Sequence, residues 1–263
     1  MRVSEPAPEP AALDAPWART VPARAARELI VCGVLGACMD GYTRRTIVGR
    51  ENLHGLTGPA LFVANHASHM DTPALLRALP PRWRRRTVVA AATDYFYADP
   101  KVAAAVSLAF GTVPLERRGG GLGAGRVDLL EGLFAGGWSL VIFAEGTRSR
   151  DGNVGRLRSG AAVLAERHGL PIVPVHMAGT HAAMPAGRRW MQRAPGRGIG
   201  NRHAIEIRFG APIRPREGEA HADVMERVRL FLAESGAATS PDPLLVRTGE
   251  AQPVEESARQ AAA

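Results

Sequence analysis

A histidine and an aspartate five residues apart, His66 and Asp71, form the first group in this sequence that could do chemistry. A histidine held by a carboxylate can act as a general base, because the carboxylate fixes the tautomer and stabilises the imidazolium that forms. On one helix this spacing would leave the side chains about 140° apart, so the pair can meet only across a strand-to-helix turn. Alternatively, Asp71 caps a helix and His66 is a polar loop residue. On these residues alone both interpretations stay open.

Metal binding is a second use that these residues could have. The ligands would be His66, His69 and Asp71. Their spacing, H-x-x-H-x-D, does not match the common hydrolytic zinc patterns, and the other six histidines are scattered along the chain. We therefore expect no metal here and place His69 beside the site.

Two more polar clusters follow apolar runs. The run Ser139–Phe143 leads into a segment that contains a carboxylate, a glycine, a hydroxyl and a guanidinium, and the run Thr112–Leu115 is followed by Arg117. A glycine permits a tight turn whose N–H groups face an anion, and arginine can bind phosphate through two parallel hydrogen bonds. The residues of the first segment are Glu145, Gly146, Thr147 and Arg148.

Alternating strand and helix patterns must position these side chains. Apolar runs predict strands, which are Thr46–Val48, Ala60–Ala64, Thr87–Ala91, Thr112–Leu115, Ser139–Phe143, Ile172–Val175 and Ala204–Phe209. Helical patterns lie between them, over Pro73–Leu79, Arg126–Phe134, Gly160–Arg167 and Asp223–Glu234. This alternation predicts an α/β fold, a single domain with a mixed, largely parallel sheet flanked by helices. Sites in such sheets form at the carboxyl ends of strands, where all three polar clusters fall.

The order of these motifs resembles the glycerolipid acyltransferase family, which contains 1-acylglycerol-3-phosphate acyltransferase. The four matching segments are N-H-x-S-x-x-D from Asn65, G-T-V-P-L-E-R from Gly111, F-A-E-G-T-R-S from Phe143, and L-P-I-V-P-V from Leu170. The resemblance covers about residues 60–179. Two departures are Ala144, where the family usually has proline, and Pro114, where it has a bulky apolar residue.

The resemblance implies a role for each motif residue. His66 would deprotonate the acceptor hydroxyl and Asp71 would orient it, whereas Arg117, Glu145, Gly146, Thr147 and Arg148 would hold the acceptor's phosphate. It implies transfer of an acyl group from acyl-CoA or acyl-carrier protein to a lysolipid, with no further cofactor. The default product is phosphatidic acid. The alternatives are another lysolipid, such as a lyso-ornithine lipid, and a lipid hydrolase that uses the same dyad.

Outside this domain, predicted to span 24–235, the chain is rich in Pro, Ala and Glu without periodicity. We therefore expect residues 1–23 and 236–263 to be disordered. Cys32 and Cys38 lie in one apolar stretch, and we predict that they are buried free thiols in a reducing compartment.

The net charge of +8 favours an anionic partner. No recognised nucleic-acid motif is present, so we expect a membrane lipid surface and no nucleic acid. Arg–Trp clusters at 82–86 and 188–202 suit such a surface, although solvated charge runs would look the same. The run Leu29–Met39 is too short to span a bilayer and fits either a core helix or a helix in the interface. We expect peripheral or monotopic attachment at the cytoplasmic face.

Overall fold

One mixed sheet of seven strands organises the chain, with the order β1-β7-β6-β2-β5-β3-β4. The computed structural model describes residues 13–115, 124–196 and 200–239. Neighbouring strands run parallel except at β6 and β7, which pair antiparallel with Val175 opposite Phe209. The sheet confirms the predicted fold class.

All seven predicted strands are present, with small shifts at their ends. The strands are β1 (Thr43–Val48), β2 (Leu61–Ala64), β3 (Thr87–Ala92), β4 (Thr112–Leu115), β5 (Ser139–Phe143), β6 (Ile172–Ala178) and β7 (His203–Phe209). The central strand β2 is buried on both faces, as its unbroken apolar run requires. Phe62 and Ala64 point into one core and Leu61 and Val63 into the other, because successive side chains alternate across a strand.

Helices cover both faces of the sheet. The first core lies under α3 (Asp71–Ala78), α4 (Pro81–Arg84) and the N-terminal helices, and the second lies under α7 (Ala124–Ala135), α8 (Gly160–His168) and α10 (His221–Glu234). The four predicted helices correspond to α3, α7, α8 and α10. Short elements complete the described part: η4 (Arg50–Leu53), α5 (Thr93–Phe96), α6 (Pro100–Phe110) and α9 (Thr180–Ala183).

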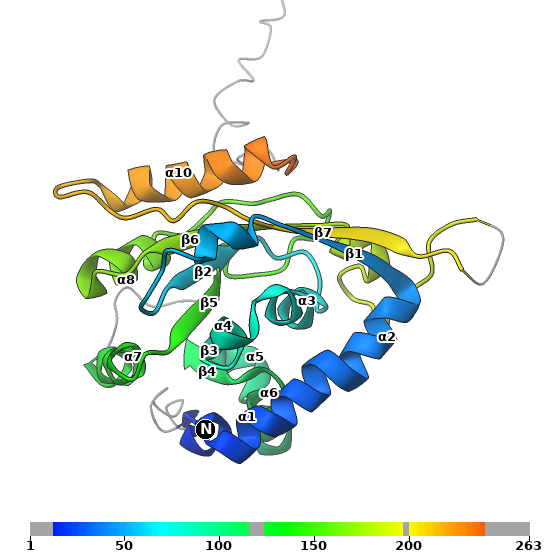
Figure 1. The fold of residues 1–263 in the computed structure, drawn as a ribbon, viewed down its shortest axis with the longest axis horizontal. Helices are drawn as coiled ribbons and strands as arrows, with labels where there is room; N and C mark the ends of the chain where they lie inside the picture. Colours follow the sequence, from blue (N-terminus) through cyan, green and yellow to red (C-terminus); the bar gives the residue numbers. More distant parts are fainter. Residues whose placement is uncertain (1–12, 116–123, 197–199, 240–263) are drawn as a thin grey trace, which may run out of the picture.

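A continuous N-terminal rod precedes β1 (Figure 1). It consists of α1 (Val21–Glu28), a π-helical stretch η3 (Leu29–Val34) and α2 (Leu35–Tyr42). Val31 and Met39 are buried in the first core, whereas Leu29 and Val34 are 69% and 60% exposed. The apolar run therefore has both a core face and an exposed face. No helix of the described residues is long and apolar enough to cross a membrane.

The disorder predicted for residues 1–23 is wrong for its second half, and residues 1–12 lie outside the described residues. A 3-10 helix (η2, Pro16–Arg19) and the start of α1 occupy this segment. Pro22 fits the first helical turn, where its missing N–H has no partner to lose. The buried Arg27 guanidinium donates to the carbonyls of Ala18, Ser107 and Leu108, which ties η2 and α1 to the end of α6.

The second segment predicted to be disordered, 236–263, is described only to residue 239. There the backbone still packs on the domain, since the N–H of Val154 donates to the carbonyl of Ala238 at 2.7 Å. Residues 240–263 lie outside the described part. Both cysteines, Cys32 and Cys38, are free thiols, as predicted, but they are half-buried and not buried, because the N-terminal rod that carries them has an exposed face.

Candidate active site

The turn from β2 to α3 brings His66 and Asp71 together. His66 Nδ1 lies 2.8 Å from Asp71 Oδ2, with the aspartate side chain fully buried and the histidine side chain 18% exposed. The strand ends at Ala64 and the helix begins at Asp71, so the pair bridges the turn as its spacing requires. With Nδ1–H donating to the carboxylate, Nε2 is the nitrogen free to accept a proton.

The Asp71 carboxylate faces backward onto the turn and does not cap its own helix. Its Oδ2 accepts the N–H groups of Ala67 at 2.7 Å and Ser68 at 2.8 Å, in addition to the histidine. No side-chain cap is made at the start of α3. Three donors compensate for burying a charged group, so the geometry excludes the interpretation of Asp71 as a simple helix cap.

Glu145 holds the backbone of the histidine. Its Oε1 accepts the N–H of His66 at 2.8 Å and its Oε2 accepts the N–H of Gly155 at 2.9 Å. Burial raises the pKa of Glu145 above its usual range, and these two N–H groups oppose the rise. The predicted contact between Glu145 and a phosphate does not fit this geometry, because both carboxylate oxygens are engaged by backbone donors.

Phe143 was not among the predicted site residues, yet it supports the histidine ring directly. The two rings stack with centroids 4.0 Å apart and planes 19° apart. The register of the sheet, with Ala64 opposite Phe143, places the end of β5 beside the residues that follow β2. A flat apolar surface under one face of the imidazole restricts its rotation.

Asn65 and Ser68 are two further supports, which stand in the N-H-x-S-x-x-D motif but were given no role from the sequence. The side-chain amide of Asn65 exchanges two hydrogen bonds with the backbone of Met177, at 3.0 and 2.8 Å. Ser68 Oγ donates to the carbonyl of Met184 at 2.7 Å, and Met70 N–H donates to Ser68 Oγ at 3.2 Å. The turn is thus fastened to β6 and to the loop after α9.

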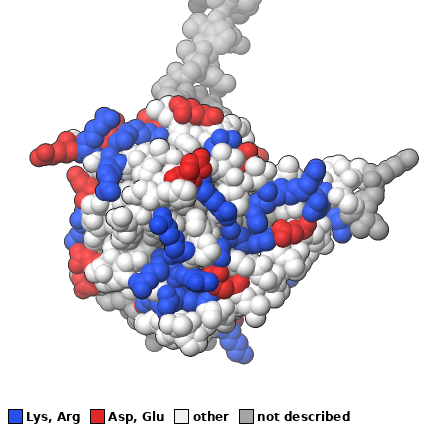
Figure 2. Space-filling model, in the orientation of Figure 1, with Lys and Arg blue, Asp and Glu red and all other residues white. Residues whose placement is uncertain are grey.

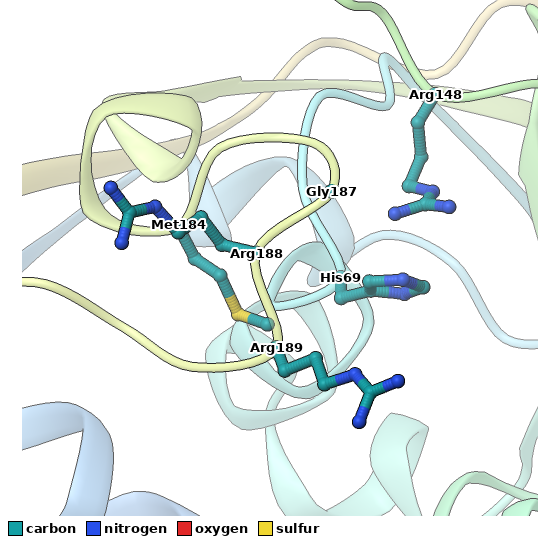
Figure 3. Close-up of a pocket in the computed structure, with 6 residues that line it drawn as sticks. All are labelled: His69, Arg148, Met184, Gly187, Arg188 and Arg189. Carbon is teal, nitrogen blue, oxygen red and sulfur yellow. The ribbon is translucent and has the colours of Figure 1, made fainter.

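A pocket of about 450 Å³ opens beside this turn (Figure 3). Its lining consists of His69, Arg148, Met184, Gly187, Arg188 and Arg189. Of the predicted substrate-binding residues that the structure describes, only Arg148 lines it. Gly146 has a φ of 72° and makes the turn after β5, and Thr147 is exposed. Arg117 lies outside the described residues.

Positive charge dominates this pocket. Burial lowers the pKa of His69, and the charge of Arg148 lowers it further, so the His69 ring is neutral near pH 7. The lining contains arginine but no carboxylate. Such a pocket can bind an anion, in particular a phosphate group. In the described ranges, no group of three or more His, Cys, Asp or Glu side chains is arranged to hold a metal ion.

Basic side chains also form broad patches on the face shown in Figure 2. In the predicted cluster 82–86, Arg82, Arg85 and Arg86 are exposed and Arg84 is half-buried. Arg84 forms two hydrogen bonds with Glu28, Arg82 donates to the carbonyl of Leu53, and Trp83 is 7% exposed. Arg82 and Arg84 therefore support the fold, and Trp83 is a core residue, whereas the exposed arginines of this cluster still contribute positive charge to the surface. Trp190 in the second predicted cluster is 56% exposed.

The family model described as Acyltransferase matches residues 44–178, about half of the chain. Two curated plant proteins are similar. The chloroplastic 1-acyl-sn-glycerol-3-phosphate acyltransferase BAT2 of Brassica napus is 34% identical over 150 residues, which are 56% of this chain and 40% of that protein. The chloroplastic 1-acyl-sn-glycerol-3-phosphate acyltransferase LPAT1 of Arabidopsis thaliana is 31% identical over 198 residues, 74% of this chain and 49% of that protein. The chain thus spans about half the length of these relatives, or less.

A solved structure shares the fold. The crystal structure of the 1-acyl-sn-glycerophosphate acyltransferase PlsC from Thermotoga maritima aligns with a TM-score of 0.59 and 24% identity. The alignment covers 86% of this chain and 84% of that one.

Proposed function

Because the chain belongs to the acyltransferase family, we propose that it transfers a fatty acyl group from an acyl thioester to the free hydroxyl of a lysophospholipid. The acceptor is 1-acylglycerol-3-phosphate and the product is phosphatidic acid, as the names of the similar plant enzymes favour. The observation that carries the proposal is the 2.8 Å contact between His66 and Asp71 at the carboxyl end of β2, beside a cationic pocket.

His66 acts as the general base in this proposal. Its Nε2 takes the proton of the acceptor hydroxyl while the oxygen attacks the thioester carbonyl. The tetrahedral intermediate collapses with cleavage of the C–S bond, and the thiolate leaves as the thiol with the proton from the imidazolium. Asp71 holds the ring and stabilises its charge between the two proton transfers. A thioester is already activated, so positioning and a base suffice without a covalent enzyme intermediate.

The donor is acyl-CoA or acyl-carrier protein, and we propose no cofactor beyond that acyl carrier. Arg148 supports a phosphate-bearing acceptor, since it lines the pocket next to His69. A lysolipid with another head group, such as a lyso-ornithine lipid, would be acylated by the same dyad, but its head group would make different contacts in this pocket.

We further propose that the protein works at the cytoplasmic face of a membrane, bound through the exposed face of the N-terminal rod. Between residues 21 and 37, the exposed positions of this rod are all apolar or glycine, namely Val21, Pro22, Ala25, Leu29, Gly33, Val34 and Ala37. Trp17 and Val102, which are 48% and 44% exposed, extend this apolar surface onto η2 and α6. An exposed apolar surface of this kind is typical of membrane or protein contacts.

Mass spectrometry of the products tests the proposed reaction. The purified full chain is given acyl-CoA and a panel of lysolipids, and we expect acylated product with 1-acylglycerol-3-phosphate. We expect His66→Ala to lose transfer while its unfolding temperature stays near that of the wild type. Release of free fatty acid without acylated lipid would identify a hydrolase, and full transfer by His66→Ala would refute the base mechanism.

A further inference from the structure

The loop that follows α9 brings two arginines to the pocket from outside the region matched by the family model. That match ends at residue 178, whereas Arg188 and Arg189 lie ten and eleven residues further along. Both line the pocket. The sequence had suggested a membrane surface for the cluster 188–202 that contains them, and not a place in the active-site pocket.

Hydrogen bonds fix the base of this loop to the active-site turn. The carbonyl of Met184 accepts the Ser68 hydroxyl at 2.7 Å, and Ser68 lies between His66 and Asp71 in the turn. Further along the loop, Gln192 N–H donates to the carbonyl of Ala183, the last residue of α9, at 2.8 Å. The two ends of the loop are thus held to each other, and its first residue is also held to the turn between β2 and α3.

The far side of the loop is held by the C-terminal end of the N-terminal rod. Trp190 Nε1 lies 3.4 Å from the hydroxyl of Tyr42, and the Arg193 guanidinium lies over the Tyr42 ring at 5.2 Å from its centroid. Arg189 lies between these contacts and Met184. Its backbone is therefore anchored on both sides, although its side chain is exposed.

The two arginines of the loop point in different directions. In Figure 3, Arg189 and Arg148 project to the side of the pocket on which His69 lies, whereas Arg188 projects to the opposite side. Within the described part of the chain, Arg189 has no carboxylate partner, and no acidic residue lines the pocket. Two guanidinium groups on one side of a pocket, with a neutral imidazole between them, suit a doubly charged anion.

We propose that Arg189 and Arg148 together bind a phosphate monoester, and that Arg189 makes this chain select substrates that carry one. This inference rests on the proposed function. Two substrates of the proposed reaction contain a phosphate monoester: the head group of 1-acylglycerol-3-phosphate and the 3′-phosphate of coenzyme A. The chemistry that Arg189 recognises is the same in both, so the experiment must tell them apart.

Steady-state kinetics of Arg189→Ala in neutral detergent micelles separates the two sources, because neutral micelles remove any effect of surface charge. Each substrate is paired with a counterpart that lacks the monoester: 1-acylglycerol for the acceptor and acyl-dephospho-CoA for the donor. Arg216→Ala is the matched control. It removes an exposed arginine from the β7–α10 connection, near the opposite end of β6, where Ile213 pairs with Ile172.

We expect Arg189→Ala to raise the KM of one phosphate-bearing substrate about tenfold and to change the KM of its counterpart by less than about twofold. A selective rise for the acceptor assigns the monoester to the lysolipid, and a selective rise for the donor assigns it to coenzyme A. Both results support the proposal. Equal changes for both members of each pair, or the same change in Arg216→Ala, would overturn it.

Calorimetric titration with glycerol 3-phosphate keeps this inference separate from the proposed reaction. If the wild type transfers no acyl group, the proposed function fails, but binding of this soluble monoester still tests the pocket. Binding by the wild type that is lost in Arg189→Ala supports the site. No binding by the wild type, or equal binding by both proteins, refutes it.

Discussion

Asp71→Asn is the substitution that most directly tests how the dyad works, because it removes one charge and almost no volume. The amide must place its NH2 group at one of the two carboxylate positions. At Oδ2 it would face the N–H groups of Ala67 and Ser68, which are donors like itself. At Oδ1, a buried atom with no hydrogen-bond partner in the described structure, it meets no donor. The amide oxygen therefore stays at Oδ2 and still accepts the His66 Nδ1–H.

The predicted magnitudes follow from this orientation. The histidine keeps its tautomer, but the imidazolium formed during transfer loses its counter-ion in a fully buried position. We expect kcat to fall about 10³-fold, which corresponds to about 4 kcal/mol of barrier. The amide NH2 left without an acceptor at the Oδ1 position costs about 1–3 kcal/mol of folding free energy.

Initial rates of thiol release and a urea denaturation curve measure the two effects. Asp223→Asn makes the same chemical change at an exposed site in the first turn of α10, and we expect its kcat to be unchanged. The double variant His66→Ala/Asp71→Asn should be no slower than His66→Ala, because the two residues act as a unit. A folded Asp71→Asn enzyme with kcat within about threefold of the wild type would refute the reasoning, since general-base catalysis contributes far more.

Three further predictions concern the supports of the site and the exposed face of the rod. Phe143→Leu removes the ring under His66, so kcat should fall up to about tenfold while both KM values hold; an unchanged kcat would show that the stack does not position the base. Leu29→Glu should weaken sedimentation with anionic vesicles roughly 30-fold, whereas Leu230→Glu on α10 should not; equal losses would place the membrane contact elsewhere. Glu145 binds its proton more tightly in the folded state, so its contribution to the unfolding free energy falls as pH rises from its ordinary pKa of 4.5 toward the raised one. The unfolding free energies of wild type and Glu145→Gln, measured across this pH range, should differ by this fall, which occurs only in the wild type. If both proteins show the same pH dependence, the raised pKa of Glu145 is contradicted.

The sequence predicted the sheet well because its strands are short apolar runs bounded by polar residues. It did not predict α6, since its exposed side contains Val102 and alanines and no polar stripe marks the helix. For the same reason the sequence left open whether the run Leu29–Met39 of the rod is a core helix or a helix in the membrane interface. An exposed apolar face looks like a core face when only residue types are known.

For the site, the sequence predicted the pair but not what supports it. The spacing of His66 and Asp71 required a turn, and the structure has one there. The partners of Glu145 are backbone N–H groups, one of them 79 residues away, and residue types do not reveal such contacts. Phe143 reads as an ordinary strand residue until the pairing of β2 with β5 places it under the histidine. Arg189 lies in a Gly- and Pro-rich loop whose path depends on contacts with Ser68 and Tyr42.

The pairing of β1 with β7 also sets an order of events during synthesis of the chain. Thr43 of β1 lies opposite His203 of β7, so these neighbours in the sheet come from far apart in the sequence. The ribosome therefore releases the rod and β1 long before their partner strand exists, and until then β1 is an unpaired strand beside an uncovered apolar helix. Such species are prone to aggregate or to bind other surfaces. A chain arrested before His203 should associate with chaperones or lipid, and release of β7 is the step that completes the edge of the sheet.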